Sequence, residues 1–184
     1  GESKEVLHKT ISNGGGTISA DLSFDGMYLS VASSSHGVSI WNAATYEELF
    51  TFPVKNEGYV FGQFNPDGSL FATTENGKSV KIWSLPLSGE TQVVTASDNS
   101  SLQSVAYSPD GTRLATITSG LNAILVIRDA FTNQELLTIQ DIDICCSIKF
   151  SPDGKYIATA SAYGAKIWDS TTGVTVQTFV GHKD

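Results

Sequence analysis

Cysteine is scarce in this chain, and its scarcity argues against two kinds of site. The sequence of 184 residues contains only Cys145 and Cys146. Neighbouring side chains on a β-strand point to opposite faces, so this pair is poorly placed for a disulfide. Neither cysteine has a partner at metal-ligand spacing, so we expect no metal site and no redox site. This usage favours a reducing compartment, and we expect an intracellular protein, cytoplasmic or nuclear.

Basic residues and long apolar runs are scarce as well. The chain has 11 Lys and Arg against 19 Asp and Glu, which gives a net charge of −8. This balance disfavours nucleic acid or an anionic membrane as the main partner, and a basic peptide or protein surface fits better. No apolar run approaches the roughly 18 residues that a membrane-spanning helix needs.

Proline is sparse, with 5 residues, whereas glycine is common, with 17. Together with frequent serine and β-branched residues, this mixture predicts many short strands joined by turns. One turn pattern occurs four times at steps of 42 or 43 residues, with an apolar residue three positions to either side. The pairs are Asp25-Gly26, Asp67-Gly68, Asp110-Gly111 and Asp153-Gly154. Asp-Gly between β-patterned runs predicts a hairpin, because Gly accepts a positive φ.

Two further β-patterned runs follow each hairpin, so each repeat predicts four antiparallel strands. We name these strands a, b, c and d in chain order. Strand c ends at a recurring position, which holds Trp41, Trp83, Arg128 and Trp168. The repeats span about 16–52, 58–96, 101–139 and 144–180, and residues 5–11 resemble a lone strand d. A single four-stranded unit exposes both faces, so neighbouring units must stack to bury a core.

The fourth repeat shows the pattern most cleanly. It reads Phe-Ser-Pro-Asp-Gly at 150–154, Ile-Ala-Thr at 157–159 and Lys-Ile-Trp-Asp at 166–169. Four phased copies of such a unit resemble the WD-repeat family of β-propellers. The resemblance implies an all-β fold with four-stranded blades around a central channel. It also implies that the Trp of strand c packs between blades and that the protein holds other proteins.

The sequence departs from the family pattern at several positions. The family often has a Gly-His pair in the connection from strand d to the next strand a, and an Asp in the turn from b to c. Here Gly-His occurs only at 181–182, none of the b–c turns carries the Asp, and Arg128 replaces one Trp. We therefore expect few or no complete buried polar networks, and stability that rests mainly on apolar packing between blades.

The number of blades has three possible explanations. The lone strand 5–11 has no vacancy to fill, because the fourth repeat already has its own strand d. The chain is then part of a larger ring of about seven blades, half of a self-associating pair, or a closed ring of four. We favour the larger ring, since unpaired strand edges are a liability. The isolated chain should then self-associate through its open blade edges.

The sequence offers little that resembles an active site. The three histidines, His8, His36 and His182, lie in different segments and lack metal-ligand spacing. A propeller hydrolase or lactonase, which is the alternative function, would need carboxylates or histidines from several blades at the channel mouth. The a strands instead present Ser19, Gln63, Ser104 and Ser147. We therefore expect a non-catalytic protein with no catalytic residue, cofactor or metal.

The variable connections are the better candidates for function. Antiparallel strands place the d–a and b–c connections on one rim, and the uniform Asp-Gly turns, which look structural, on the other. Loops that vary in length and charge are where binding tends to occur. The candidate residues on the first rim are His36, Lys55, Glu57, Asp98, Asp141, Asp143 and Tyr163. We predict a mildly acidic docking rim for a basic segment of a partner protein. The competing interpretation is that these are ordinary solvated loop charges.

Overall fold

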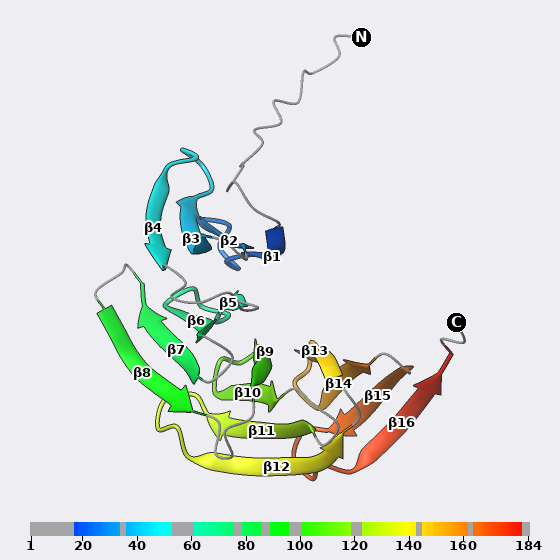
Figure 1. Ribbon diagram of the computed structural model, residues 1–184. Helices are drawn as coiled ribbons and strands as arrows, with labels where there is room; N and C mark the ends of the chain where they lie inside the picture. Colours follow the sequence, from blue (N-terminus) through cyan, green and yellow to red (C-terminus); the bar gives the residue numbers. More distant parts are fainter. Residues whose placement is uncertain are drawn as a thin grey trace.

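The computed structural model describes most of the chain from residue 17 onward. The described ranges are 17–33, 36–52, 61–75, 79–85, 89–95, 101–118, 123–142, 145–161 and 164–181. These residues form four antiparallel sheets of four strands each, and they contain no helix (Figure 1). No membrane-spanning helix is therefore present among them.

Each sheet is one blade, and each strand pairs with the next one in the chain. Blade 1 contains β1 (Thr17–Leu22), β2 (Tyr28–Ser33), β3 (Gly37–Asn42) and β4 (Glu48–Phe52). Blade 2 contains β5 (Gly62–Phe64), β6 (Leu70–Glu75), β7 (Ser79–Ser84) and β8 (Gly89–Thr95). Blade 3 contains β9 (Leu102–Tyr107), β10 (Arg113–Thr118), β11 (Ala123–Asp129) and β12 (Glu135–Ile142). Blade 4 contains β13 (Cys145–Phe150), β14 (Tyr156–Ser161), β15 (Gly164–Asp169) and β16 (Thr175–Val180).

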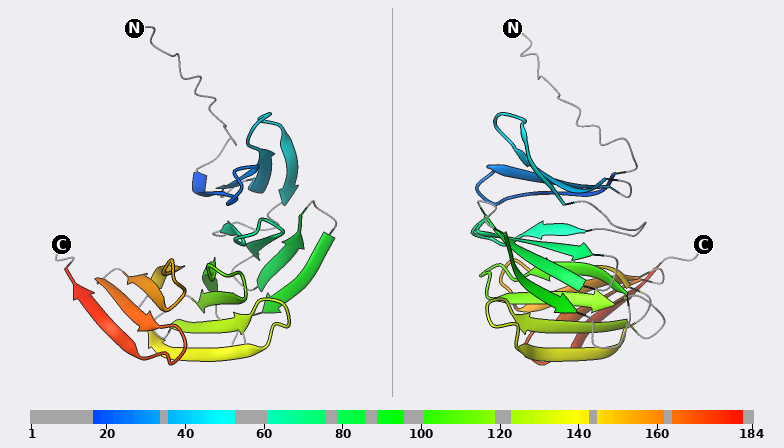
Figure 2. Two further views of the ribbon diagram at one scale, coloured as in Figure 1. Left: turned by 180° about the vertical axis from the view of Figure 1, so that it is seen from behind. Right: turned by 60° about the vertical axis from the view of Figure 1, so that its left-hand side comes forward.

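The four blades are arranged in an open arc. The first strand of each blade lies on the inside of the arc and the last strand lies on the outside (Figure 1). Seen from behind, the arc is the same, and from the side the sheets stack face to face (Figure 2). This is the arrangement of a partial β-propeller, and it confirms the all-β fold predicted from the repeat.

The a–b turns are built from the side chains that repeat in the sequence. In blade 4 the backbone N–H of Gly154 donates to the carbonyl of Ser151 at 2.9 Å, and Gly154 has φ of 69°. The Asp153 carboxylate accepts from the Ser151 hydroxyl at 2.6 Å and from the N–H of Lys155 at 3.1 Å. These two bonds hold the pKa of Asp153 below its usual value. The other three turns repeat the backbone bond and the positive φ of the glycine, which confirms the predicted Asp-Gly hairpins. Ser23 and Ser108 donate to Asp25 and Asp110 in the same way, whereas in blade 2 the donor to Asp67 is the Ser69 hydroxyl.

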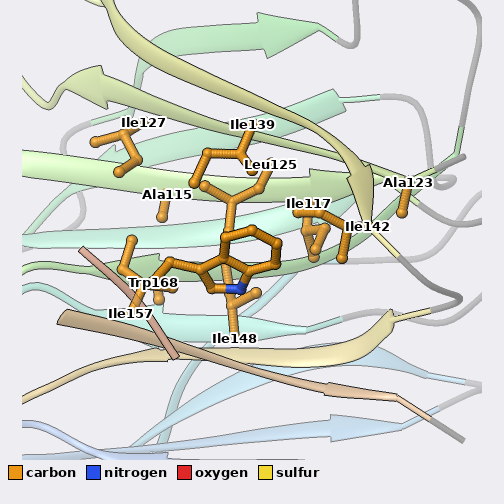
Figure 3. Close-up of a cluster of buried hydrophobic side chains, with 11 residues drawn as sticks. Ala115, Ile117, Ala123, Leu125, Ile127, Ile139, Ile142, Ile148, Ile157 and Trp168 are labelled. Atoms are coloured by element: carbon orange, nitrogen blue, oxygen red, sulfur yellow. The ribbon is translucent and has the colours of Figure 1, made fainter. Parts of the chain in front are cut away.

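The hydrophobic core lies between the blades. Three clusters of buried side chains each join two consecutive blades, one cluster at each seam. At the seam between blades 3 and 4, Trp168 of β15 packs with Leu125 and Ile117 of blade 3 (Figure 3). At the seam between blades 1 and 2, Phe71 is fully buried in a cluster that includes Ile40 of blade 1. Apolar packing between blades is therefore a main source of stability, as the sequence predicts.

Candidate functional site

The inner surface of the arc is lined by the a strands. Side chains from all four blades surround a cavity of about 220 Å³ there. Its polar lining includes Ser19, Gln63, Ser104, Ser147 and Lys149. Asp21 also lines it, but the Asp21 carboxylate accepts a hydrogen bond from the backbone N–H of Phe64 at 3.0 Å. Hydroxyl, amide and ammonium groups of this kind can hold a ligand by hydrogen bonds, and the described residues contain no group of three His, Cys, Asp or Glu side chains that could hold a metal ion.

Side chains of the a strands also tie neighbouring blades together. Asp21 joins blade 1 to the backbone of blade 2, and Gln63 repeats this link one blade further along. The Gln63 side-chain oxygen accepts from the backbone N–H of Tyr107 at 3.1 Å. Blade 3 has Ala106 at the equivalent position, and alanine offers no acceptor. The seam between blades 3 and 4 therefore needs a different link.

Arg113 supplies that link. Its guanidinium donates to the Gly154 carbonyl at 2.7 Å and to the Ser170 hydroxyl at 3.0 Å, both in blade 4. The same guanidinium lies over the Phe150 ring, 5.2 Å from its centroid. Hydrogen bonds from a charged donor are about twice as strong as neutral ones, and the cation–π contact adds to them. Arg113 thus fastens blade 4 to blade 3.

Part of the buried polar network survives inside the blades. The indole N–H of Trp83 donates to the Thr73 hydroxyl at 3.0 Å, and that of Trp168 donates to Thr159 at the same distance. A lysine lies near each indole ring, since Lys81 and Lys166 are both 5.7 Å from the ring centroid of the Trp two positions later. The sequence analysis assigned these threonines no role, although each lies six residues after the Asp of its Asp-Gly turn and Thr159 is part of the quoted repeat.

Blades 3 and 1 have different hydrogen bonds at the position that holds Trp83 and Trp168 in the other two blades. Arg128 of blade 3 is 6% exposed, and it donates to the Thr116 hydroxyl at 3.3 Å and to the Glu135 carboxylate at 2.6 Å. The arginine therefore keeps the bond to threonine that tryptophan makes elsewhere. In blade 1 the threonine is replaced by Val31, and the buried indole N–H of Trp41 has no hydrogen-bond partner among the described residues.

The predicted docking rim is described only in part. His36 is exposed just before β3, and its backbone N–H donates to the Ser33 hydroxyl at 3.1 Å. Asp141 lies in β12 and not in the d–a connection where the sequence analysis placed it. The strand continues because Ile142 pairs with Ala123. The other candidates, together with the lone strand at 5–11, lie outside the described residues: Lys55, Glu57, Asp98, Asp143 and Tyr163.

Comparison with known proteins identifies the repeat. The family model described as "WD domain, G-beta repeat" matches residues 47–84 and 136–169. Each match ends at the last strand-c residues of its blade, one position after Trp83 and Trp168 respectively. No curated protein matches the chain. WD40 repeat domains are generally non-catalytic scaffolds that bind other proteins. Residues 47–84 and 136–169 thus match WD40 repeats, and together with the four-bladed arc they support a WD-repeat family for this chain.

Proposed function

We propose that this chain is a non-catalytic scaffold and a module of a larger assembly, and that it docks partners on the rim formed by the d–a and b–c connections. The observation that carries the proposal is the charge of the d–a connections. Residues 53–61 contain one lysine and one glutamate, whereas Asp98, Asp141 and Asp143 in or beside the next two connections are all acidic. The partner segment would accordingly be basic.

The physical basis of the proposed docking is electrostatic attraction between these aspartates and basic residues of the partner. Such attraction mainly raises the association rate, and it weakens as salt shortens the Debye length, which is about 8 Å at physiological ionic strength. The net charge of −8 acts in the same direction. A basic peptide should therefore bind faster at low salt, and its dissociation rate should change less.

The experiment compares two variants with opposite changes in charge on the same rim. A labelled lysine-rich peptide is titrated into the wild type, into the triple variant Asp98→Asn, Asp141→Asn, Asp143→Asn, and into Lys55→Gln. We expect weaker binding in the triple variant and tighter binding in Lys55→Gln. Equal binding by all three proteins would contradict docking on this rim. Turnover in a hydrolase screen would instead favour a propeller enzyme that acts at the channel mouth.

The assembly part of the proposal is supported by one face of blade 4. Phe179 of β16 is 53% exposed, whereas the equivalent Ile139 of blade 3 is 7% exposed because blade 4 covers it. A further WD-type blade, supplied by a larger ring, would cover Phe179 in the same way. Without that blade the chain should self-associate through this face. Gel filtration at rising concentration tests the idea, and a clean monomer at high concentration would contradict it.

A further inference from the structure

A second cavity lies at the a–b end of the arc, on the rim opposite the proposed docking rim. Its volume is about 480 Å³, and residues of all four blades line it. The lining residues that matter here are Leu22, Phe24, Pro66, Tyr107, Pro109 and Pro152. The sequence analysis treated this rim as structural, so no binding role was expected there.

The walls of this cavity come from one repeated position. Pro66, Pro109 and Pro152 each precede the Asp of an a–b turn, and Phe24 occupies that position in blade 1. Phe24 is 89% exposed and the neighbouring Leu22 is 56% exposed. Large apolar side chains that gather around an open cavity in this way mark a surface for contact with a partner. We call this surface the turn cavity.

Tyr107 provides a second and independent sign of a ligand. The residue is 6% exposed, and its hydroxyl is buried with no hydrogen-bond partner among the described residues. Burial and the nearby Asp67 carboxylate raise the pKa of Tyr107, so the hydroxyl keeps its proton at neutral pH. Buried hydroxyls nearly always have a partner. A ligand that enters the turn cavity, displaces the side chains covering this hydroxyl and brings an acceptor oxygen to it would complete the missing bond.

The charge around the turn cavity is mostly negative. Phe24 and the three turn prolines are each followed by an aspartate, and hydrogen bonds from serine hydroxyls and backbone N–H groups lower the pKa of all four carboxyl groups. Two cations lie close to them. Lys155 is 3.8 Å from Asp153, and the Arg113 guanidinium is engaged by Gly154 and Ser170. Among the described residues, the turn aspartates therefore outnumber the nearby cations, which favours a basic ligand.

We propose that the turn cavity binds an extended, proline-containing peptide segment flanked by basic residues. Polyproline II segments have no internal hydrogen bonds, so their carbonyl groups are available to the Tyr107 hydroxyl. They dock on surfaces lined by aromatic and apolar side chains, as Phe24, Leu22 and the turn prolines provide. The flanking basic residues face the turn aspartates. This site lies on the opposite rim from the acidic docking rim and does not depend on it.

The test uses a short fluorescein-labelled peptide in which prolines and a leucine are flanked by arginines. Phe24→Ala should weaken binding by about tenfold, since exposed aromatic anchors dominate such contacts. Tyr107→Phe should weaken it by about two- to tenfold, the effect of one neutral hydrogen bond. Thermal stability should not fall in Tyr107→Phe, because the lost hydroxyl has no partner among the described residues.

Three controls make the outcome decisive. Phe131→Ala removes another exposed aromatic residue, from the c–d turn of blade 3, and should bind like the wild type. A peptide with glutamate in place of arginine should bind more weakly, as should one with serine in place of proline and leucine. The proposal is overturned if the arginine peptide does not bind, if Phe24→Ala binds it as well as the wild type does, or if the serine peptide binds equally. Loss of binding only in the triple variant of Asp98, Asp141 and Asp143 would assign the peptide to the docking rim instead.

Discussion

Blades 3 and 4 carry similar residues on the face that points away from the preceding blade, but only blade 3 buries them. Ala115, Ile127 and Ile139 of blade 3 are at most 7% exposed because blade 4 covers them. At the same repeat positions of blade 4, Ala158 is exposed, Ile167 is half-buried and Phe179 is 53% exposed. The difference shows that a neighbouring blade, and not the sequence of the blade itself, decides whether an apolar position is buried.

The largest expected effect on stability comes from shortening the equivalent isoleucine in each blade, Ile127 in blade 3 and Ile167 in blade 4. Ile127→Ala should destabilise the protein by about 2–5 kcal/mol, because it removes buried methyl groups and leaves a cavity. Ile167→Ala should cost clearly less than half of that, because Ile167 is only half-buried. Urea unfolding of both variants gives the two free energies. Equal losses would show that the two faces do not differ as described.

The next effect concerns the link between these two blades. Arg113→Ala removes the hydrogen bonds to Gly154 and Ser170 and the contact with Phe150, and should cost about 1.5–3 kcal/mol. Lys155→Ala, in the exposed turn next to this link, should cost less than about 0.5 kcal/mol. Thermal unfolding of the two variants measures both. If Arg113→Ala unfolds at the wild-type temperature, the link does not stabilise the seam.

A smaller effect distinguishes blade 1 from blade 4. Thr159→Val leaves the buried indole N–H of Trp168 without its acceptor and should cost about 1–2 kcal/mol. Val31→Thr is the reverse change, and it gives the unpaired indole N–H of Trp41 an acceptor. It should stabilise the protein by up to about 1 kcal/mol. Urea unfolding compares the pair, and a loss of stability in Val31→Thr would contradict the assigned geometry.

The smallest effect is a dependence on pH that all four a–b turns share. The pKa of Asp110 is lowered in the folded protein, first by the Ser108 hydroxyl. A lowered folded pKa contributes stability above the unfolded pKa of about 4, and that contribution is lost as the pH falls below it. Asp110→Asn should therefore lower the unfolding temperature at pH 7 and reduce its fall between pH 5 and pH 3. If the unfolding temperature of Asp110→Asn fell as steeply between pH 5 and pH 3 as that of the wild type, the Asp110 carboxylate would not be a source of the pH dependence.

Much of the fold could be predicted because the repeat carries its own local chemistry. Asp153 and Gly154 define a turn whatever surrounds it, since their bonds and φ lie within the turn itself. The positions of Trp83 and Trp168 likewise follow from the period. Local chemistry of this kind is visible in one sequence because neighbours in the chain are neighbours in space.

The other features depend on contacts between blades, which the period does not encode. Arg113 stands where the other repeats have tyrosine or leucine, and nothing in the sequence shows that it reaches Ser170, 57 residues away. The turn cavity was missed for the same reason, because it forms only when four turns meet. The sequence analysis placed Asp141 in a loop, because the end of β12 depends on its pairing with β11, which the sequence alone does not show.

The central claim is that neighbouring blades bury the apolar faces of each blade and thereby slow hydrogen exchange of its backbone amides. Hydrogen–deuterium exchange of the whole chain tests this claim most directly, because β10 and β11 of blade 3 can be compared with the equivalent β14 and β15 of blade 4. Among the described residues, blade 3 is packed against a neighbour on both faces and blade 4 on one. Slower exchange in β10 and β11 than in β14 and β15 is the result we expect. Equal exchange in the two pairs would contradict the claim.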